Sequence, residues 1–166
     1  MSEGAVQDRY PDDFAHCYGC GRLNPHGLRV RSRWDGDETV ATLLPRPHHT
    51  AVPGFVYGGL IASLIDCHGT GSAALAAERA ALQRGVAQPG DPPPRFVTAA
   101  LRVDYVRPTP LGAALEARGR IVELKERKVV VAITVSAGGE ACARGEVVAV
   151  RMPVGMMAGG GSGRPG

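Results

Sequence analysis

The stretch GFVYGGLIASLIDCHGTGSA, residues 54–73, decides the fold because it opens the only long helical segment that the sequence predicts. Two of its features are costly in a buried helix. Each of the adjacent glycines Gly58 and Gly59 weakens a helix interior by about 1 kcal/mol relative to alanine. Asp66 lies between apolar neighbours, where an ionised carboxylate is unfavourable unless something compensates it. The helical interpretation depends on apolar residues at Leu60, Ile61, Leu64, Ile65 and Leu75 and on the alanine-rich run that follows.

Composition narrows the class of protein. The chain has 166 residues, 44% of them hydrophobic, which suits one soluble domain with a real core. The net charge is only +3 and basic residues alternate with acidic ones, so we expect neither nucleic acid nor a membrane surface as a partner. No run approaches the about 20 apolar residues of a membrane helix, and no signal-peptide pattern is present. We therefore predict a cytoplasmic protein with reduced cysteines.

Strand-like segments lie on both sides of the helix. The runs LRVRSRW (28–34) and ETVATLL (38–44) flank an Asp-Gly turn signal, which predicts a hairpin. The proline-rich run 85–95 then predicts a surface loop. Short linkers separate the later strands, which favours a meander of antiparallel neighbours. These four runs are FVTAALRVDYV (96–106), ALEARGRIVEL (114–124), KVVVAITVSA (128–137) and EACARGEVVAV (140–150).

The order of two strands, one helix and four strands predicts an α+β domain. One helix cannot cover both faces of a six-stranded antiparallel sheet, but it can fill the concave face of a curved one. We expect this single domain to span residues 14–152. The polar residues 1–13 and the glycine-rich tail 153–166 are predicted to be flexible segments outside it.

Three stretches in this order carry a family resemblance: CYGCGRLNPHGL (17–28), PGFVYGGLIASLID (53–66) and VTAALRVDYVRPTPLG (97–112). A weaker match is ERKVVVAITV (126–135). The chain resembles the hotdog-fold acyl-CoA thioesterases of the PaaI-like and THEM-like group. The resemblance implies a curved six-stranded sheet around one central helix and a homodimer with a continuous sheet, with pairing into a homotetramer left open. It also implies an acyl-CoA substrate and no cofactor.

The family signature is His-Gly-Gly followed by an aspartate nine residues after the histidine. Tyr57, Gly58 and Gly59 occupy the triplet here, and Asp66 has the required spacing. By resemblance, the backbone N–H of Gly58 donates to the thioester carbonyl. The family's histidine is replaced by Tyr57.

The residues themselves suit this chemistry. A helix N-terminus offers unpaired N–H groups to a developing oxyanion, and Gly58 lets a carbonyl come close. Asp66 can act as general base or as nucleophile, and the sequence leaves both routes open. Eight residues at 1.5 Å rise place Gly58 and Asp66 about 12 Å apart along one helix. The two groups must therefore come from two copies in an antiparallel arrangement.

Further site residues follow from the resemblance alone. Thr98 at the start of the third strand is expected to hold the attacking water or to orient Asp66. The phosphates of coenzyme A require a few cationic groups. By resemblance, the positions that contact coenzyme A are Asp104, Arg107, Arg127 and Lys128. Tyr57 and Gly59 are further expected substrate-binding residues.

Four other interpretations compete. Cys17 and Cys20 have the spacing of half a zinc site, but no second Cys-x-x-C pair exists, so we expect no metal. Cys67 is not expected to be a nucleophile, because it points about 100° away from Asp66. A hotdog dimer that binds acyl-CoA or another small ligand without turnover is the main alternative function. Hydratase chemistry ranks last, because the required pairing of aspartate and histidine is missing.

Overall fold

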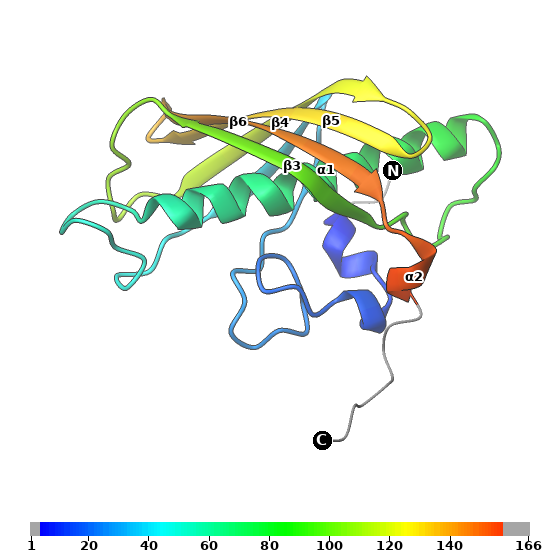
Figure 1. Ribbon diagram of the computed structural model, residues 1–166, viewed down its shortest axis with the longest axis horizontal. Coiled ribbons are helices and arrows are strands. Elements are labelled where there is room, and N and C mark those ends of the chain that lie inside the picture. Colours follow the sequence, from blue (N-terminus) through cyan, green and yellow to red (C-terminus); the bar gives the residue numbers. More distant parts are fainter. Residues whose placement is uncertain (1–3, 158–166) are drawn as a thin grey trace.

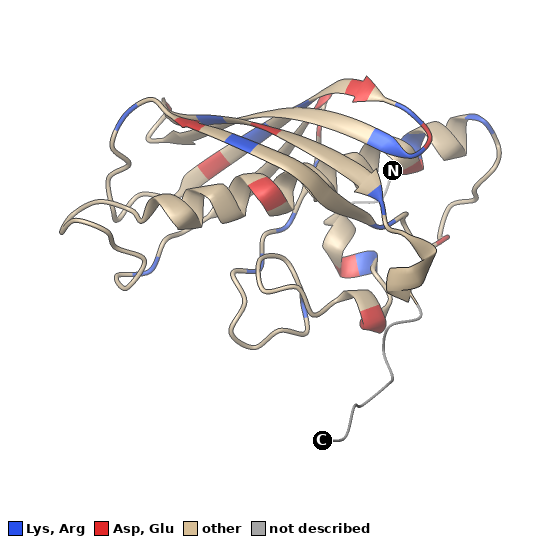
Figure 2. Ribbon diagram, in the orientation of Figure 1, with Lys and Arg blue, Asp and Glu red and all other residues tan. Residues whose placement is uncertain are grey.

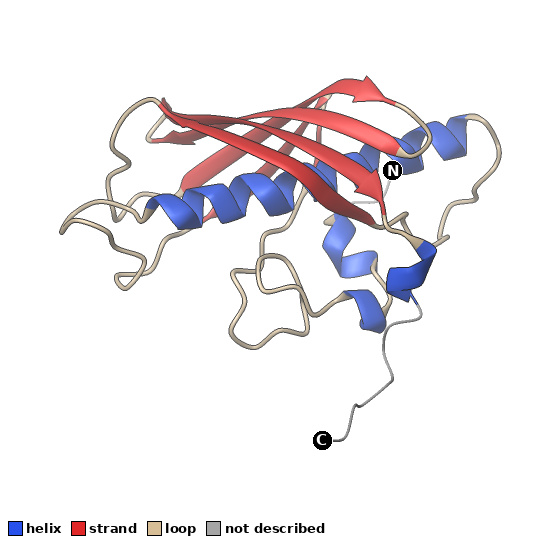
Figure 3. Ribbon diagram, viewed as in Figure 1, coloured by secondary structure: helices blue, strands red, loops and turns tan. Residues whose placement is uncertain are grey.

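The computed structural model describes residues 4–157 of the chain. One six-stranded antiparallel sheet curves over one long helix, α1 (Gly58–Gln83), as Figures 1 and 3 show. The predicted α+β architecture of a curved sheet around a central helix is confirmed. The strands are β1 (Arg33–Asp35), β2 (Glu38–Leu43), β3 (Phe96–Tyr105), β4 (Leu115–Leu124), β5 (Lys128–Ala137) and β6 (Glu140–Arg151), in the spatial order β1-β2-β4-β5-β6-β3.

The first hairpin forms where the Asp-Gly signal predicts it. Asp35 ends β1 and pairs with Glu38 of β2 across the turn. Gly36 has φ of 65°, a left-handed conformation that glycine adopts without strain. The first strand is shorter than expected, because only three residues join the ladder.

The predicted meander of the last four strands is wrong in one pairing. β4, β5 and β6 do follow one another across the sheet, but β3 pairs with β6 and not with β4. β4 instead lies beside β2, so it joins the first hairpin to the rest of the sheet. This arrangement leaves β3 as an edge strand.

The central helix is buried on nearly every side. All residues from Cys67 to Ala77 are buried. α1 contains only three charged residues, Asp66, Glu78 and Arg79, so most of it is tan in Figure 2. By length and composition α1 could span a membrane, but 83% of its most apolar window is buried inside this structure. An all-round apolar helix of this kind is a core helix.

Two glycines in α1 allow other elements to come close. A Cβ at Gly69 would lie 2.5 Å from Cγ2 of Val147 on β6, so the lack of a side chain lets this strand pack close to the helix. A Cβ at Gly71 would lie 2.5 Å from Nε2 of Gln7. At Gly71 the close neighbour is therefore the N-terminal segment and not a strand.

The expectation that residues 1–13 lie outside the domain is wrong for residues 4–13. This segment contains the 3₁₀ turn Val6–Arg9 and most of a second 3₁₀ turn, Asp12–Phe14. The N-terminal segment lies against the side of α1 that faces away from the sheet (Figure 1). Val6 and Tyr10 are buried in the core, and the Arg9 guanidinium forms a two-bond ion pair with the Glu78 carboxylate of α1. The segment is ordered because α1 has a second apolar side to cover.

The C-terminal prediction is only partly open to comparison. Val154–Met157 form one exposed helical turn, α2, after the last strand. Residues 1–3 and 158–166, which include most of the predicted tail, lie outside the described residues.

His68 lies in a buried polar network between the helix, the N-terminal segment and the sheet. Its Nδ1 is 2.9 Å from Oγ of Ser32, and its Nε2 is 3.2 Å from Oγ1 of Thr39. Oγ1 of Thr39 also lies 2.6 Å from Oγ of Ser72. Burial lowers the pKa of His68 to about 4, so the ring is neutral near pH 7. His68 is thus a satisfied structural residue.

Candidate active site

The first turn of α1 presents unpaired backbone amides. Gly58 is its first residue, and no side chain caps the helix at Tyr57. The opening N–H groups of a helix have no internal partners and lie at the positive end of its dipole. The structure thus gives Gly58 the position that suits a donor to a developing negative charge.

Two tyrosines frame this helix start. The Tyr105 hydroxyl at the end of β3 donates a 2.6 Å hydrogen bond to the carbonyl oxygen of Gly58. Burial raises the pKa of Tyr105, and the neighbouring Tyr57 adds to the rise. The Tyr57 ring lies over Gly59, where a Cβ would be 2.3 Å from the ring. Gly59 is therefore needed for the ring to take this place.

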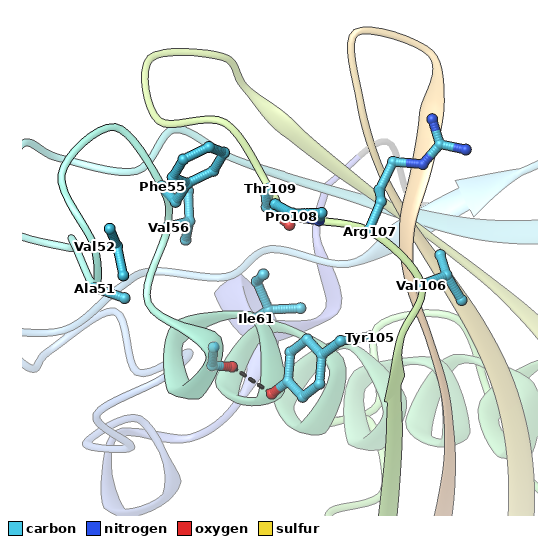
Figure 4. Close-up of a pocket in the computed structure, with 11 residues that line it drawn as sticks. Ala51, Val52, Phe55, Val56, Ile61, Tyr105, Val106, Arg107, Pro108 and Thr109 are labelled. Carbon is cyan, nitrogen blue, oxygen red and sulfur yellow. Dashed lines mark hydrogen bonds between the residues drawn. The ribbon is translucent and has the colours of Figure 1, made fainter.

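An apolar cavity of about 620 Å³ opens beside Gly58. Figure 4 shows Tyr105 and Ile61 on one side of it and the loop before α1 on the other. A cavity of this size and character suits an acyl chain or another apolar group. Its lining consists of Ala51, Val52, Phe55, Val56, Gly58, Ile61, Tyr105, Val106, Arg107, Pro108 and Thr109.

The predicted catalytic aspartate and its predicted partner lie in contact. The Thr98 hydroxyl on β3 donates a hydrogen bond to Oδ1 of Asp66 on α1. The pairing of β3 with β6 shifts register between Thr98 and Ala100, a β-bulge next to this contact. Asp66 is half-buried, whereas the neighbouring Cys67 is buried on another side of the helix.

Gly58 and Asp66 do not meet within one chain. Two full turns of α1 separate them, about 12 Å along the axis, and Asp66 does not line the cavity at Gly58. Each copy of the chain therefore has an amide donor and an apolar cavity at the start of α1, and a carboxylate held by Thr98 two turns further along the helix.

Two of the predicted coenzyme A contacts lie near the cavity end of β3. Arg107 lines the cavity, and its Nη1 is 2.5 Å from Oε2 of Glu140. Asp104 is exposed, and its Oδ2 is 3.1 Å from Nε of Arg102. The structure thus brings Arg107 to the helix start, whereas Asp104 pairs with its own strand.

The other two predicted contacts lie elsewhere. Arg127 lines a separate hollow together with Arg84 and Arg151. Arg84 directly follows the C-terminal end of α1. Nζ of Lys128 is 3.2 Å from Oε2 of Glu123. Arg127 thus lies near the C-terminal end of α1, whereas Gly58 is the first of the 26 residues of this helix.

Tyr105 and the apolar lining of the cavity were not predicted from the sequence. Tyr105 stands one residue after Asp104 in the matched third-strand motif, and an aromatic residue at a strand end carries little signal of its own. Phe55 and Val56 precede the glycine pair directly, so their apolar character was the only available sign of a cavity at the helix start.

Comparison with known proteins decides the family. The family model described as the thioesterase superfamily matches residues 53–144. The chain belongs to the thioesterase superfamily. This membership supports thioester hydrolysis in general and agrees with the resemblance to the PaaI-like group. No curated protein sequence matches the chain.

Solved structures agree with the superfamily fold. A thioesterase superfamily protein from Shewanella loihica PV-4 is 52% identical, with a TM-score of 0.65 over 86% of this chain and 98% of that one. A thioesterase from Haemophilus influenzae, EC 3.1.2.-, shares 17% identity, with a TM-score of 0.62 over 81% of this chain and 86% of that one. A phenylacetic acid degradation-related putative thioesterase from Ralstonia eutropha JMP134 shares 17%, with a TM-score of 0.56 over 74% and 85%. At such identities, the last two likenesses concern the fold alone.

Proposed function

We propose that this superfamily member is an acyl-CoA thioesterase that releases a free acid and coenzyme A. The observation that carries the proposal is the uncapped start of α1 at Gly58, which opens on an apolar cavity. The cavity would take the acyl group. The amide would polarise the thioester carbonyl and hold the oxyanion that forms during attack.

A second copy of the chain would complete the site. β3 is an edge strand, and Ala99 to Arg102 are exposed along it. Such an edge can pair with the same strand of another copy and extend the sheet. Two antiparallel helices side by side would then bring Asp66 of one protomer near Gly58 of its mate. We propose this homodimer as the active unit, with further pairing into a tetramer open.

The reaction can follow two balanced routes. As general base, Asp66 takes a proton from water while the water oxygen bonds to the carbonyl carbon. The tetrahedral intermediate then breaks its C–S bond, and coenzyme A leaves as a thiolate that gains the proton. As nucleophile, the Asp66 carboxylate forms a mixed anhydride and expels the thiolate, and water then hydrolyses the anhydride. Thr98 acts as a positioning residue in both routes.

The phosphates of coenzyme A would be bound by cations outside the cavity. Arg107 is the nearest candidate, because it lines the cavity rim and is half-exposed. Arg127 and Lys128 could serve the same ligand only if the partner brings them to this end. We propose no cofactor, and a cytoplasmic location where acyl-CoA is available.

A binding protein without turnover is the second candidate. It is favoured by one observation, the replacement of the family histidine by Tyr57, whose ring covers Gly59 beside the proposed donor. A dimer of this kind would retain acyl-CoA in the same cavity without release of a thiol.

A steady-state assay distinguishes the two candidates. The purified protein is offered short-chain, long-chain and aromatic acyl-CoAs while a thiol reagent follows the release of coenzyme A. We expect turnover with at least one class, and the variant Asp66→Asn should reduce kcat at least tenfold without loss of fold. Tight binding without thiol release from any substrate would favour the binding protein. Equal kcat values for wild type and Asp66→Asn would reject the assigned role of the carboxylate.

A further inference from the structure

Three cysteine sulfurs from two distant parts of the chain lie together. Cys17 and Cys20 belong to the N-terminal segment, and Cys67 belongs to α1. Their Sγ atoms all lie within 4.8 Å of one another, and those of Cys17 and Cys67 are 3.9 Å apart. Four thiolates around a tetrahedral zinc ion, with Zn–S bonds of about 2.3 Å, lie roughly 3.8 Å apart. The spacing thus fits ligands of one metal ion.

Two glycines shape the segment that carries the first two cysteines. A Cβ at Gly19 would lie 2.2 Å from Sγ of Cys67, so only glycine lets this sulfur approach the turn. A Cβ at Gly21 would lie 2.5 Å from the backbone nitrogen of Cys17. Any other residue at Gly19 would displace the Cys67 sulfur, and any other residue at Gly21 would displace the backbone at Cys17.

A backbone hydrogen bond closes this turn. The N–H of Gly21 donates a 2.7 Å hydrogen bond to the carbonyl oxygen of Cys17. A Cys-x-x-Cys pair in such a turn is a common half of a zinc site.

A positive charge lies beside the three sulfurs. The half-buried Arg95 interacts electrostatically with Cys17, Cys20 and Cys67, and its guanidinium lies 4.8 Å from the centre of the Tyr10 ring. Among residues 4–157, no carboxylate forms an ion pair with it. Three thiolates, one divalent cation and one guanidinium together have no net charge, which removes most of the cost of burying them.

We propose that Cys17, Cys20 and Cys67 bind one zinc ion as thiolates. Binding releases the three thiol protons and needs no oxidant. The fourth position would take an oxygen donor, either water or the Tyr10 hydroxyl, which is buried near Cys20 without a hydrogen-bond partner. The ion would fasten the N-terminal segment to α1 at the residue that follows Asp66, on another side of the helix.

No metal was expected from the sequence, because the chain has no second Cys-x-x-C pair. The third ligand comes instead from a single cysteine 47 positions after Cys20, within the central helix. Only the fold brings it to the turn. The proposal is independent of thioester hydrolysis, because its main measurement is the metal itself.

The test uses the full chain purified without a polyhistidine tag from zinc-supplemented cells. Mass spectrometry of the metal content should give one zinc per chain for wild type and for the matched control Cys142→Ser, whose cysteine lies outside the cluster. Cys67→Ser should lose most of the zinc. Cobalt exchanged into wild type should give the near-ultraviolet charge-transfer band of thiolate ligands, and Tyr10→Phe should alter the band if its hydroxyl is the fourth ligand.

Wild-type readouts keep the test decisive even if Cys67→Ser fails to fold. Protein without zinc, together with a cobalt titration that gives no charge-transfer band, would overturn the proposal. A disulfide among these three cysteines, found by peptide mapping of freshly purified protein, would overturn it as well. If Cys67→Ser retained one zinc ion per chain, Cys67 would be excluded as a ligand.

Discussion

Thr98 on the edge strand β3 donates a hydrogen bond to Asp66 on the central helix. This bond joins two elements that are 32 positions apart in sequence, and it leaves only part of the Asp66 carboxylate free to act. The strand thereby fixes the direction in which the carboxylate can meet water or a carbonyl carbon.

Removal of the Thr98 hydroxyl should therefore affect the rate more than binding. Thr98→Val keeps the shape of the side chain but has no donor, and we expect kcat to fall about tenfold with KM little changed. Thr98→Ser restores the hydroxyl and should recover most of the rate. Kinetics on the best acyl-CoA substrate measure both effects, and equal kcat values for the valine variant and wild type would exclude a positioning role.

The amide of Gly58 can be deleted without damage to the helix. Proline is favoured at the first helical position, and Tyr57 at ψ of 128° has a conformation that can precede it. Gly58→Pro should lower kcat by about 10² to 10³, the effect of losing one oxyanion donor. Gly58→Ala is the matched control, because it adds a Cβ in ordinary contact with Tyr105 but keeps the N–H.

A mixture of variants tests whether the site is shared. Gly58→Pro and Asp66→Asn subunits, unfolded together and refolded, form heterodimers in which one of the two sites has both groups intact. Some activity should return relative to either variant alone. Two inactive parents that stay inactive after verified mixing would place both groups in one chain and contradict the proposed interface.

The edge of β3 should control assembly. Leu101 is 41% exposed on this edge, and Leu101→Asp places a charge where a second strand would pair. We expect this variant to be a monomer, as measured by size-exclusion chromatography with light scattering. Its thioesterase activity should be greatly reduced. Leu124→Asp is the control, since Leu124 is 44% exposed at the end of β4. A dimer that persists in Leu101→Asp and dissociates in Leu124→Asp would place the interface elsewhere.

His68 should make stability depend on pH. Its folded-state pKa of about 4 lies below the ordinary value of 6.5, so the unfolded chain binds more protons between these values. The free energy of unfolding should therefore fall as pH falls through this range, by about 2 kcal/mol between pH 7 and pH 5. Urea unfolding at both pH values measures the change. The variant His68→Gln should lose this part of the dependence, and equal slopes for both proteins would contradict the assignment.

Local patterns predicted the elements better than their partners. The Asp35-Gly36 turn and the run from Leu60 to Leu75 determine short-range structure, and both formed as expected. The pairing of β3 with β6 depends on which neighbouring strand β3 reaches in the folded sheet. The alternation of residues within one strand does not encode this choice of partner. Residues 4–13 look polar in sequence, yet Val6 and Tyr10 are buried in the core.

The site divides in the same way. The Gly-Gly-Asp spacing and the family resemblance predicted Gly58, Asp66 and Thr98, and the structure places Thr98 on Asp66. Tyr105 and the cluster at Cys67 depend on contacts between distant segments. Such contacts follow from tertiary packing, and the local periodicity of the sequence does not predict them.

The cover that residues 4–32 give to α1 has a practical meaning for fragment design. A fragment trimmed to the family match, residues 53–144, would lack β1, β2 and the whole of this cover. Its bare apolar helix would meet water along one flank, and the β4 edge would be left open. Such a truncated piece should collect in inclusion bodies, so expression clones should begin no later than residue 4.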